Sequence, residues 1–253
     1  MARAIATRLR STGIDTLVEV FGGSAAVMLN AGFQKRVYND ADNSIVNVFR
    51  VIADSQKCAA LARHLTTMPP SRTIFDACDY PPKGEEIERA AKTLYRQVFC
   101  FGGKGRSGGF SVSISNRPEI KEISRYRGVI ARLDRFTDFF HSTMIECLDY
   151  QECVRIYGRK TNAVLFCDPP YVGTENYYRA GSFADWDHWN LAQMLNNVPA
   201  HVVLTYYDDP KLRELYPESK WKWERVIVTK NCRFRNTNKP KVDEFIISKR
   251  RHS

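Results

Sequence analysis

The sequence predicts an α/β protein whose doubly wound sheet carries a second, mostly helical and loop-rich region. Short apolar runs, typical of buried strands, alternate with segments of helical periodicity before and after a basic middle region. A glycine-rich turn follows the first of these runs, and an Asp-Pro-Pro-Tyr sequence closes a later one. We therefore expect residues 1–65 and 142–253 to form the α/β domain, with residues 66–141 inserted into it.

The expected strands and helices follow from the period of the apolar residues. Short apolar runs predict strands at residues 16–21, 36–40, 142–147, 164–167 and 201–205, and an antiparallel pair at 223–229 and 244–248. Helical spacing predicts helices at residues 2–12, 25–31, 44–64, 85–98, 120–140, 151–157 and 186–197. Turn formers fill residues 69–84, and residues 99–116 form a glycine-rich, irregular loop.

The strand at residues 164–167 ends in Asp168-Pro169-Pro170-Tyr171. Neither proline has an N–H group, so a central strand cannot continue through them. Open α/β sheets bind their ligands at the carboxyl ends of such strands. That edge therefore presents a carboxylate, rigidly directed backbone carbonyls and a flat ring. The alternative interpretation is a strand-ending turn without a function.

The turn after the first strand is built from small residues, at positions 22–26. Small residues there let a ligand approach the backbone closely, with helix N–H groups directed at it. The next strand ends at Asp40, where nucleotide-binding folds present a carboxylate to ribose hydroxyls. Asp40 is equally a candidate helix N-cap, as are Asp42 and Asn43.

The chain carries a net charge of +10, which indicates a polyanionic partner. Glycines, aromatic residues and basic residues are interleaved from residue 99 to residue 135, a composition suited to contacts with phosphates and base edges. The candidate DNA-binding residues are Lys104, Arg106, Arg125 and Arg127. A solvated basic helix that follows a mobile loop would have the same composition.

None of the seven cysteines belongs to a Cys-x-x-Cys pair, which favours reduced, mostly buried thiols over disulfides or a zinc site. The sequence has no apolar run as long as a membrane span and no apolar signal region at its N-terminus. We therefore expect a cytoplasmic protein that binds neither a metal nor a membrane.

Four motifs, in this order, resemble those of the Dam-type, D12-class DNA adenine-N6 methyltransferases, particularly the phage and prophage members. The cofactor motif of that family, Glu-Pro-Phe-x-Gly-x-Gly, corresponds to residues 19–25, and its Asn-Asp motif corresponds to Asn39-Asp40. The segment before its catalytic strand corresponds to residues 146–150, and its Asp-Pro-Pro-Tyr motif is matched without change at residues 168–171. The resemblance covers most of residues 15–250 and is weakest from 66 to 116.

This resemblance implies a Rossmann-like methyltransferase sheet, S-adenosylmethionine as the cofactor and double-stranded DNA as the partner of a monomeric enzyme. It implies that the catalytic residues are Asp168, Pro169, Pro170 and Tyr171. The residues implied to bind the cofactor are Glu19, Phe21, Gly22, Gly23, Ser24, Asp40, Asp149 and Tyr150. Among these, Asp40 would bind the ribose and Asp149 the adenine amine of the cofactor.

The catalytic motif suits an exocyclic amine, whose lone pair is delocalised into the ring and which is therefore a poor nucleophile. The Asp168 carboxylate and the Pro169 carbonyl can accept its two hydrogens, which favours a tetrahedral nitrogen and stabilises the charge that develops during transfer. Such an amine is out of reach in a stacked duplex. The base must therefore be flipped out, with Tyr171 as its stacking platform.

The sequence departs from the family pattern on the cofactor side. Ala25 replaces the last glycine of the loop and Val20 the proline; a methyl group at position 25 fits the loop if its φ is negative. The aromatic-x-Gly-Gly-Lys segment with which the family usually begins has no counterpart before residue 15. We expect these departures to affect cofactor binding more than the methyl acceptor's site.

Three alternatives remain at this stage. A cytosine-N4 or RNA amine methyltransferase would use the same acceptors, although Asp rather than Asn or Ser at position 168 favours adenine in DNA. A catalytically impaired DNA-binding relative would lack the N-terminal cofactor lysine. A dinucleotide-dependent oxidoreductase is disfavoured, because Gly-x-Gly-x-x-Gly is absent after the first strand.

Overall fold

The computed structural model describes residues 1–101, 108–112, 118–173, 183–229 and 241–250. The described strands form a seven-stranded sheet with the strand order β3-β2-β1-β4-β5-β7-β6. The strands are β1 (Thr16–Glu19), β2 (Lys35–Asn39), β3 (Met144–Glu146), β4 (Ala163–Cys167), β5 (His201–Tyr207), β6 (Trp221–Thr229) and β7 (Lys241–Lys249). β1 runs parallel to β2 and β4, and β4 parallel to β5, whereas β7 is antiparallel to β5 and β6. The predicted doubly wound α/β fold with a terminal antiparallel pair is confirmed.

The chain divides into two compact units. The first comprises Met1–Ala41 and Glu146–Ser253, and the second comprises Asp42–Ile145. Residues 42–65, which we expected to belong to the α/β domain, fall in the second unit. The reason is packing: the helices formed by these residues lie against a later helix of the same unit, α6 (Glu86–Phe99).

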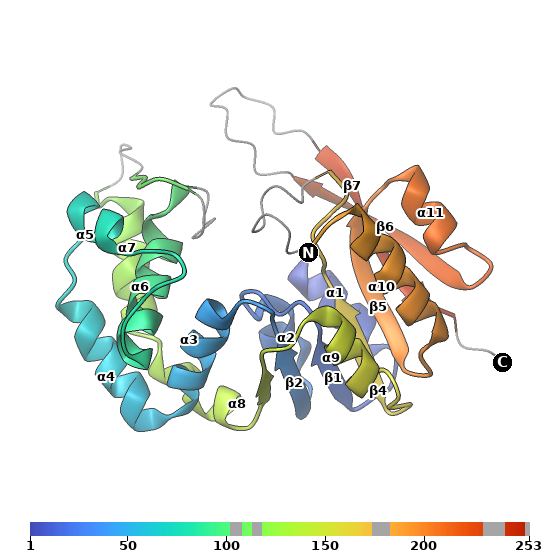
Figure 1. Ribbon diagram of the computed structural model, residues 1–253, viewed down its shortest axis with the longest axis horizontal. Helices are drawn as coiled ribbons and strands as arrows, with labels where there is room; N and C mark the ends of the chain where they lie inside the picture. The colour runs from blue at the N-terminus through green and yellow to red at the C-terminus, as the bar shows by residue number, and fades with distance from the viewer. Residues whose placement is uncertain (102–107, 113–117, 174–182, 230–240, 251–253) are drawn as a thin grey trace. The chain divides into compact units, whose positions relative to one another are not determined.

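In the first unit, helices cover both faces of the sheet. Figure 1 shows α9 (Tyr150–Tyr157) and α10 (Asp185–Asn197) in front of the sheet and the paler α1 (Ala2–Arg10) behind it. The other helices in the described part of this unit are α2 (Ala26–Ala31), which packs on α1, and α11 (Pro210–Leu215). All five residues of β4 are buried, as expected for a central strand covered on both faces.

The second unit is mostly helical in its described part, and it ends within β3. Its helices are α3 (Asn43–Ala53), α4 (Ser55–Thr66), α5 (Arg72–Ala77), α6, α7 (Lys121–Ile130), a 3-10 turn at Asp134–Phe136 and α8 (Thr137–His141). The short helix α5 was not predicted, and the helix predicted at 120–140 is divided into α7, the turn and α8. In the predicted glycine-rich loop, Cys100 and Phe110 form an isolated antiparallel bridge.

The single helix predicted at residues 44–64 is wrong, because the chain is extended at Asp54. The Asp54 backbone (φ −102°, ψ 120°) ends α3, and its carboxylate accepts hydrogen bonds from the N–H groups of Gln56 and Lys57 at 2.9 and 3.0 Å. One aspartate thus ends the first helix and caps the second.

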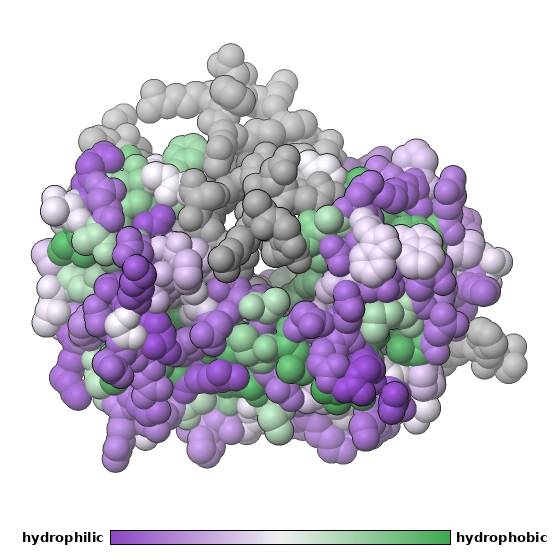
Figure 2. Space-filling view, viewed as in Figure 1, coloured by the Kyte–Doolittle hydropathy of each residue, from purple (hydrophilic) through white to green (hydrophobic). Residues whose placement is uncertain are grey.

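The exposed side chains are largely hydrophilic, and the described cysteines are free and mostly buried. Hydrophilic side chains dominate the face drawn in Figure 2. The six cysteines in the described part of the chain are free, and all but Cys147 are buried, as predicted. None of the described helices is both long enough and apolar enough to cross a membrane.

Candidate active site

The carboxyl ends of β1 and β4 meet where the sheet changes its direction of winding. From β1 the chain continues to β2 on one side, whereas from β4 it continues to β5 on the other. Doubly wound sheets bind ligands at this switch point. The Val20 N–H donates to the Phe166 carbonyl at 2.9 Å, so the loop after β1 and the loop after β4 start side by side. The glycine turn and Asp168 are therefore brought to one edge of the sheet.

Asp168 is held at this edge by the neighbouring strand. Cys167 pairs with Leu204 in the parallel register, which places Asp168 next to Thr205 of β5. The Thr205 hydroxyl donates to Asp168 Oδ1 at 2.8 Å. Pro169 and Pro170 are buried behind the carboxylate, whereas Asp168 itself stays open to solvent.

Two influences on the Asp168 carboxylate oppose each other. The surrounding protein raises its pKa, while the hydrogen bond from the Thr205 hydroxyl and the proximity of the Tyr171 hydroxyl lower it. Because the residue keeps contact with solvent, we expect the carboxylate to be ionised at neutral pH. An ionised Asp168 is a hydrogen-bond acceptor only, as an amine substrate requires.

Tyr171 is fixed by contacts at both ends of its side chain. Its hydroxyl donates to Glu244 Oε1 of β7 at 2.6 Å. Its ring meets the Tyr207 ring edge-on, with 4.5 Å between centroids, and lies 5.7 Å from the Tyr206 ring. Burial raises the pKa of Tyr171, so the phenol keeps its proton. The ring is thus held in one orientation beside Asp168.

The glycine turn after β1 needs its two glycines for different reasons. A Cβ on Gly22 would lie 2.2 Å from Cε2 of the buried Tyr38 ring. Gly23 has a φ of +48°, and a Cβ there would meet no atom within 4 Å. Gly22 therefore permits close packing, whereas Gly23 faces open space that a ligand can enter.

Asn39 and Asp40 connect this turn to the rest of the edge. The buried Asn39 amide donates to the carbonyls of Val20 (2.9 Å) and Leu148 (3.1 Å) and accepts from the Leu148 N–H (2.9 Å). Asp40 Oδ2 accepts from the Gly23 N–H at 2.8 Å. The capping alternative for Asp40 is wrong, because Asp42 caps α3 by accepting from the Ser44 N–H.

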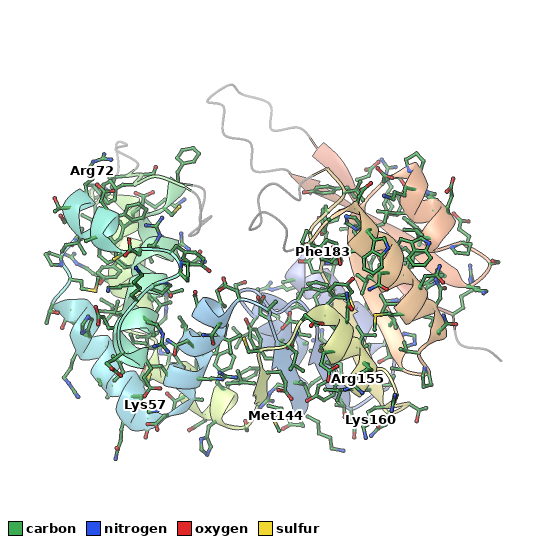
Figure 3. All side chains as sticks on the ribbon, in the orientation of Figure 1. Lys57, Arg72, Met144, Arg155, Lys160 and Phe183 are labelled. Atoms are coloured by element: carbon green, nitrogen blue, oxygen red, sulfur yellow. The ribbon has the colours of Figure 1, made fainter. Side chains whose placement is uncertain are left out.

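Three aromatic rings meet on the other side of the turn. Phe21 stacks on Tyr150 with 5.9 Å between centroids, and Phe183 contacts both rings, at 5.8 and 5.5 Å. Figure 3 shows Phe183 just before α10. The Tyr150 hydroxyl donates to Asp187 (2.8 Å) and accepts from Asn190 (2.9 Å), and burial raises the pKa of Tyr150 to about 12. Tyr150 and Phe183 are buried and Phe21 is partly exposed, so a ligand would meet this aromatic cluster at Phe21.

Glu19, the last residue of β1, has a buried carboxylate that can accept a further hydrogen bond. It is 2% exposed, and its Oε2 has no hydrogen-bond partner among the residues that the structure describes. Burial raises its pKa well above the usual value, the negative charges of Asp168 and Asp40 raise it further, and the Met28 N–H opposes this. An unpartnered buried acceptor of this kind fits a ligand that carries an amine or ammonium group.

Comparison with known proteins agrees with this geometry. Residues 1–231 match the family model of the D12 class N6 adenine-specific DNA methyltransferases. The chain belongs to this family. It is 24% identical over 238 residues to the DNA N-6-adenine-methyltransferase of Escherichia phage P1, which covers 85% of this chain but only 29% of that protein. It is 24% identical to the DNA adenine methylase of Haemophilus influenzae (92% of this chain, 84% of the relative) and 27% identical to the retron Ec67 DNA adenine methylase of Escherichia coli (79% and 71%).

Ala25 departs from the methyltransferase motif in a way that affects the backbone. Its φ is +55°, in the left-handed region, so the condition under which a methyl group fits the loop without strain is not met. This conformation costs a non-glycine residue about 1 kcal/mol. The turn nevertheless closes, with the Ala25 N–H donating to the Gly22 carbonyl at 2.8 Å.

The other predicted residues of the methyltransferase are less tightly placed. Ser24 is exposed in the turn. Asp149 is exposed and caps α9 by accepting from the Glu152 N–H at 2.9 Å. In the second unit, Arg125 and Arg127 are exposed on α7, and Arg127 pairs with Glu119. The predicted DNA contacts Lys104 and Arg106 lie outside the described residues. Within the described ranges, no group of three or more His, Cys, Asp and Glu side chains could hold a metal ion.

Three residues of the candidate site could not be identified from the sequence. Thr205 and Glu244 lie in predicted strands, but only the pairing of β5 with β4 and β7 brings them to Asp168 and Tyr171. The sequence places Phe183 only in a polar, aromatic loop. No local signal distinguishes these residues from other strand or loop positions.

Proposed function

We propose that this chain transfers the methyl group of S-adenosylmethionine to N6 of an adenine flipped out of double-stranded DNA. The observation that carries the proposal is the Asp168 carboxylate, fixed by Thr205 at 2.8 Å and followed by two buried prolines at the switch point of the sheet. The family to which the chain belongs supports the same chemistry.

The acceptor side of the site would bind the adenine amine. Asp168 Oδ1 is already occupied by Thr205, which leaves Oδ2 to accept one N6 hydrogen, and the Pro169 carbonyl accepts the other. Proline residues limit the rotation of this backbone, so both acceptors are preorganised. The ring face of Tyr171 would stack on the base. Pro170 would restrict the direction of the backbone after the strand end.

The cofactor side would hold S-adenosylmethionine, which supplies an electrophilic methyl group on a sulfonium when bound. We infer that Glu19 accepts from the amino group of its methionine part, with Phe21, Gly22, Gly23 and Ser24 as the floor. The unpartnered Glu19 Oε2 and the open space beside Gly23 support this assignment. Asp40, Asp149 and Tyr150 would bind its adenosine part, with Phe183 as a further stacking ring.

The second unit would recognise the DNA target. We propose that residues 66–141, with the packed helices before them, form the target-recognition region. Lys104, Arg106, Arg125 and Arg127 would contact the phosphates and base edges. We expect the chain to act as a monomer in the cytoplasm, on DNA alone and without a metal.

The deciding experiment incubates the protein with methyl-labelled S-adenosylmethionine and mixed-sequence duplex DNA, which is then digested to nucleosides. We expect label in N6-methyladenine, and none with Asp168→Ala. Label in N4-methylcytosine, or label in RNA but not in DNA, would contradict the assignment. Calorimetry measures the binding of S-adenosylmethionine. Binding is expected for an enzyme, and no binding for a DNA-binding relative that has lost its cofactor site. Mapping the methylated adenines on genomic DNA would identify the target sequence.

A further inference from the structure

The hydroxyl of Tyr171 lies between two carboxylates. It donates to Glu244 Oε1 at 2.6 Å, and it lies close enough to the Asp168 carboxylate to influence the pKa of that group. A phenol has only one proton to donate. Its direction therefore decides how many acceptor positions Asp168 keeps for a substrate amine.

The fold brings Glu244 to this position through the strand register. Glu244 of β7 pairs with Tyr207 of β5, and directly opposed residues of an antiparallel pair share a face of the sheet. Thr205, two residues before Tyr207, lies on the same face and binds Asp168. Asp168, Thr205 and Glu244 are therefore neighbours although they come from three strands.

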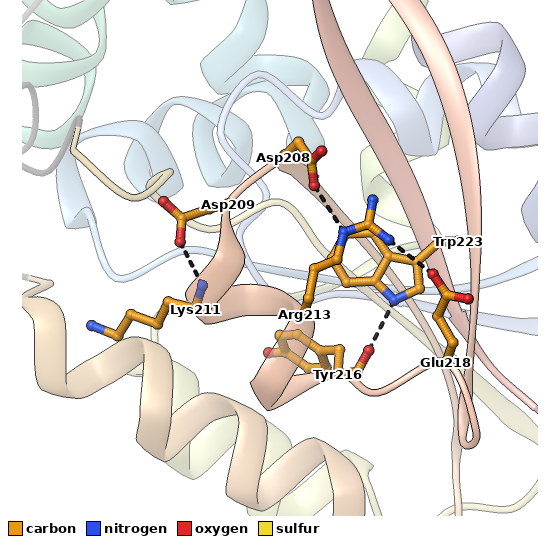
Figure 4. A network of polar contacts seen from close by, with 7 residues as sticks. All are labelled: Asp208, Asp209, Lys211, Arg213, Tyr216, Glu218 and Trp223. Atoms are coloured by element: carbon orange, nitrogen blue, oxygen red, sulfur yellow. Dashed lines mark hydrogen bonds and ion pairs between the residues drawn. The ribbon is translucent and has the colours of Figure 1, made fainter.

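The segment that carries Glu244 is rigidly packed. The next residue, Phe245, packs edge-on against Trp223 of β6 with 5.5 Å between centroids. The Arg213 guanidinium lies 4.4 Å from the Trp223 ring and 5.2 Å from the Phe245 ring, held by Asp208 and Glu218 (Figure 4). Glu244 itself is 8% exposed, so its carboxylate is not free to exchange Tyr171 for water.

We propose that Glu244 is a positioning residue for methyl transfer. It accepts the Tyr171 proton, which keeps that proton off Asp168 and holds the stacking ring in place. This inference rests on the proposed function, since it assigns Asp168 and Tyr171 to the bound adenine. Ionised Glu244 leaves Asp168 Oδ2 free for the N6 hydrogen. A protonated Glu244 would instead donate to Tyr171, whose own proton would turn toward Asp168.

The proposed role of Glu244 makes methyl transfer depend on pH. Burial raises the pKa of Glu244, and the negative charge of Asp168 raises it further, while the hydrogen bond from Tyr171 and the α-amino group of Met1 lower it. Tyr207, the register partner, also faces this carboxylate. Activity should therefore fall as the pH drops through the raised pKa of Glu244, at a higher pH than for an exposed glutamate.

The first test compares kcat for DNA methylation by wild type, Glu244→Gln and Glu244→Asp. Gln carries no charge, and its NH2 group can donate to the Tyr171 hydroxyl, so it no longer holds the Tyr171 proton in one direction. Asp is one methylene shorter than Glu and does not reach the hydroxyl. We expect each variant to lower kcat about tenfold, without changing KM for S-adenosylmethionine, because Asp168 and Tyr171 are then less well positioned for the transfer step while the cofactor contacts are kept. In Glu244→Gln the acid limb of the pH profile should also move to lower pH.

The matched control is Asp243→Asn, which removes a carboxylate from the preceding residue of the same strand. Asp243 pairs with Arg225 at 2.7 Å and is 38% exposed. We expect its kcat to stay within about twofold of wild type. An equal loss in Asp243→Asn and Glu244→Gln would overturn the inference, because it would show a general effect of charge on this strand.

The second test is a double-mutant cycle with Tyr171→Phe, measured by single-turnover methylation at a pH on the plateau. If Glu244 acts through the hydroxyl, Glu244→Gln causes no further loss in the Tyr171→Phe background. Losses that multiply would overturn the inference; if Glu244→Gln does not fold, Glu244→Asp completes the cycle. If wild type methylates adenine and the variants methylate it at the same rate, only this inference is refuted. Wild type that fails to methylate adenine refutes the proposed function as well.

Discussion

The Thr205 hydroxyl donates a hydrogen bond of 2.8 Å to Asp168 Oδ1, from the centre of a strand that is buried around it. This contact has two effects on the carboxylate. It fixes the rotation of Asp168, so that Oδ2 points away from β5, and it lowers the pKa of Asp168 against the rise caused by the surrounding protein. Position and ionisation of the proposed catalytic group therefore depend on one residue of the neighbouring strand.

Thr205→Val should lower kcat about tenfold, the equivalent of ~1.4 kcal/mol in the activation free energy. Valine has the shape of threonine but no donor, so Asp168 loses both its orientation and the contact that lowers its pKa. Because the ionised forms of both Asp168 and Glu244 are required, a rise in the pKa of Asp168 should move the acid limb of the pH–kcat profile to higher pH. Thr205→Ser keeps the donor and should retain the wild-type profile. A valine variant with an unshifted limb would contradict this account.

Gly22→Ala and Gly23→Ala should have different effects. At Gly22 the methyl group would lie 2.2 Å from the buried Tyr38 ring, so we expect a loss of about 2 kcal/mol in the free energy of unfolding. At Gly23 the strain of a positive φ costs about 1 kcal/mol, and the methyl group projects into open space. Thermal unfolding should therefore single out Gly22→Ala, whereas S-adenosylmethionine calorimetry should show that Gly23→Ala weakens binding.

Gly32→Ala is the control for this comparison. Gly32 also has a positive φ (+73°), and a Cβ there would meet no atom within 4 Å, but it lies beyond the end of α2. We expect Gly32→Ala to lower stability as much as Gly23→Ala does, but to leave the affinity for S-adenosylmethionine unchanged. Equal affinity losses at positions 23 and 32 would show that backbone strain, and not the space beside Gly23, controls binding.

This edge of the sheet could be predicted from the sequence because each of its motifs consists of residues that are adjacent in the chain. Asp168 follows a buried apolar run and precedes two prolines, so strand, strand end and carboxylate are all local features. The same holds for Gly22 and Gly23, although the clash that makes Gly22 necessary involves Tyr38 of the next strand. Local periodicity was therefore sufficient to place both motifs on one edge.

Thr205, Glu244 and the break at Asp54 could not be predicted in this way. Thr205 and Glu244 matter because β7 inserts antiparallel between β5 and β6, and no local pattern specifies that order. The apolar stripe of residues 44–64 continues through Asp54 with little change, so periodicity favours one helix. The structure has two helices because the aspartate satisfies the N–H groups of a new helix start.

Asp54→Ala should destabilise the second unit by about 1 kcal/mol, the usual cost of losing an N-cap. Its carboxylate accepts from two backbone N–H groups, which alanine leaves without a partner from the side chain. Urea unfolding followed by far-ultraviolet circular dichroism measures this difference. Asp76→Ala, an exposed position inside α5, removes the same charge and should change stability by less than about 0.5 kcal/mol. Equal effects would contradict the capping role.

Glu19→Gln should stabilise the protein without its cofactor and weaken cofactor binding. The folded-state pKa of Glu19 is raised well above its usual value of 4.5, so folding disfavours the ionised form. Wild-type stability should therefore fall as the pH rises from about 4.5 toward the raised pKa and level off above it. The variant lacks this loss. Its free energy of unfolding should exceed that of wild type by about 1 kcal/mol at neutral pH but not at pH ~4.

Urea unfolding at several pH values, with and without S-adenosylmethionine, tests both parts of this prediction. The cofactor should stabilise wild type more than Glu19→Gln, because only the carboxylate gives its ammonium group an ionic partner. Glu152→Gln is the control: this partly exposed glutamate pairs with Arg155, which lowers its pKa, so its removal should not produce the same pH dependence. A Glu19→Gln variant that is equally stabilised by the cofactor would show that the buried carboxylate serves the fold and not the ligand.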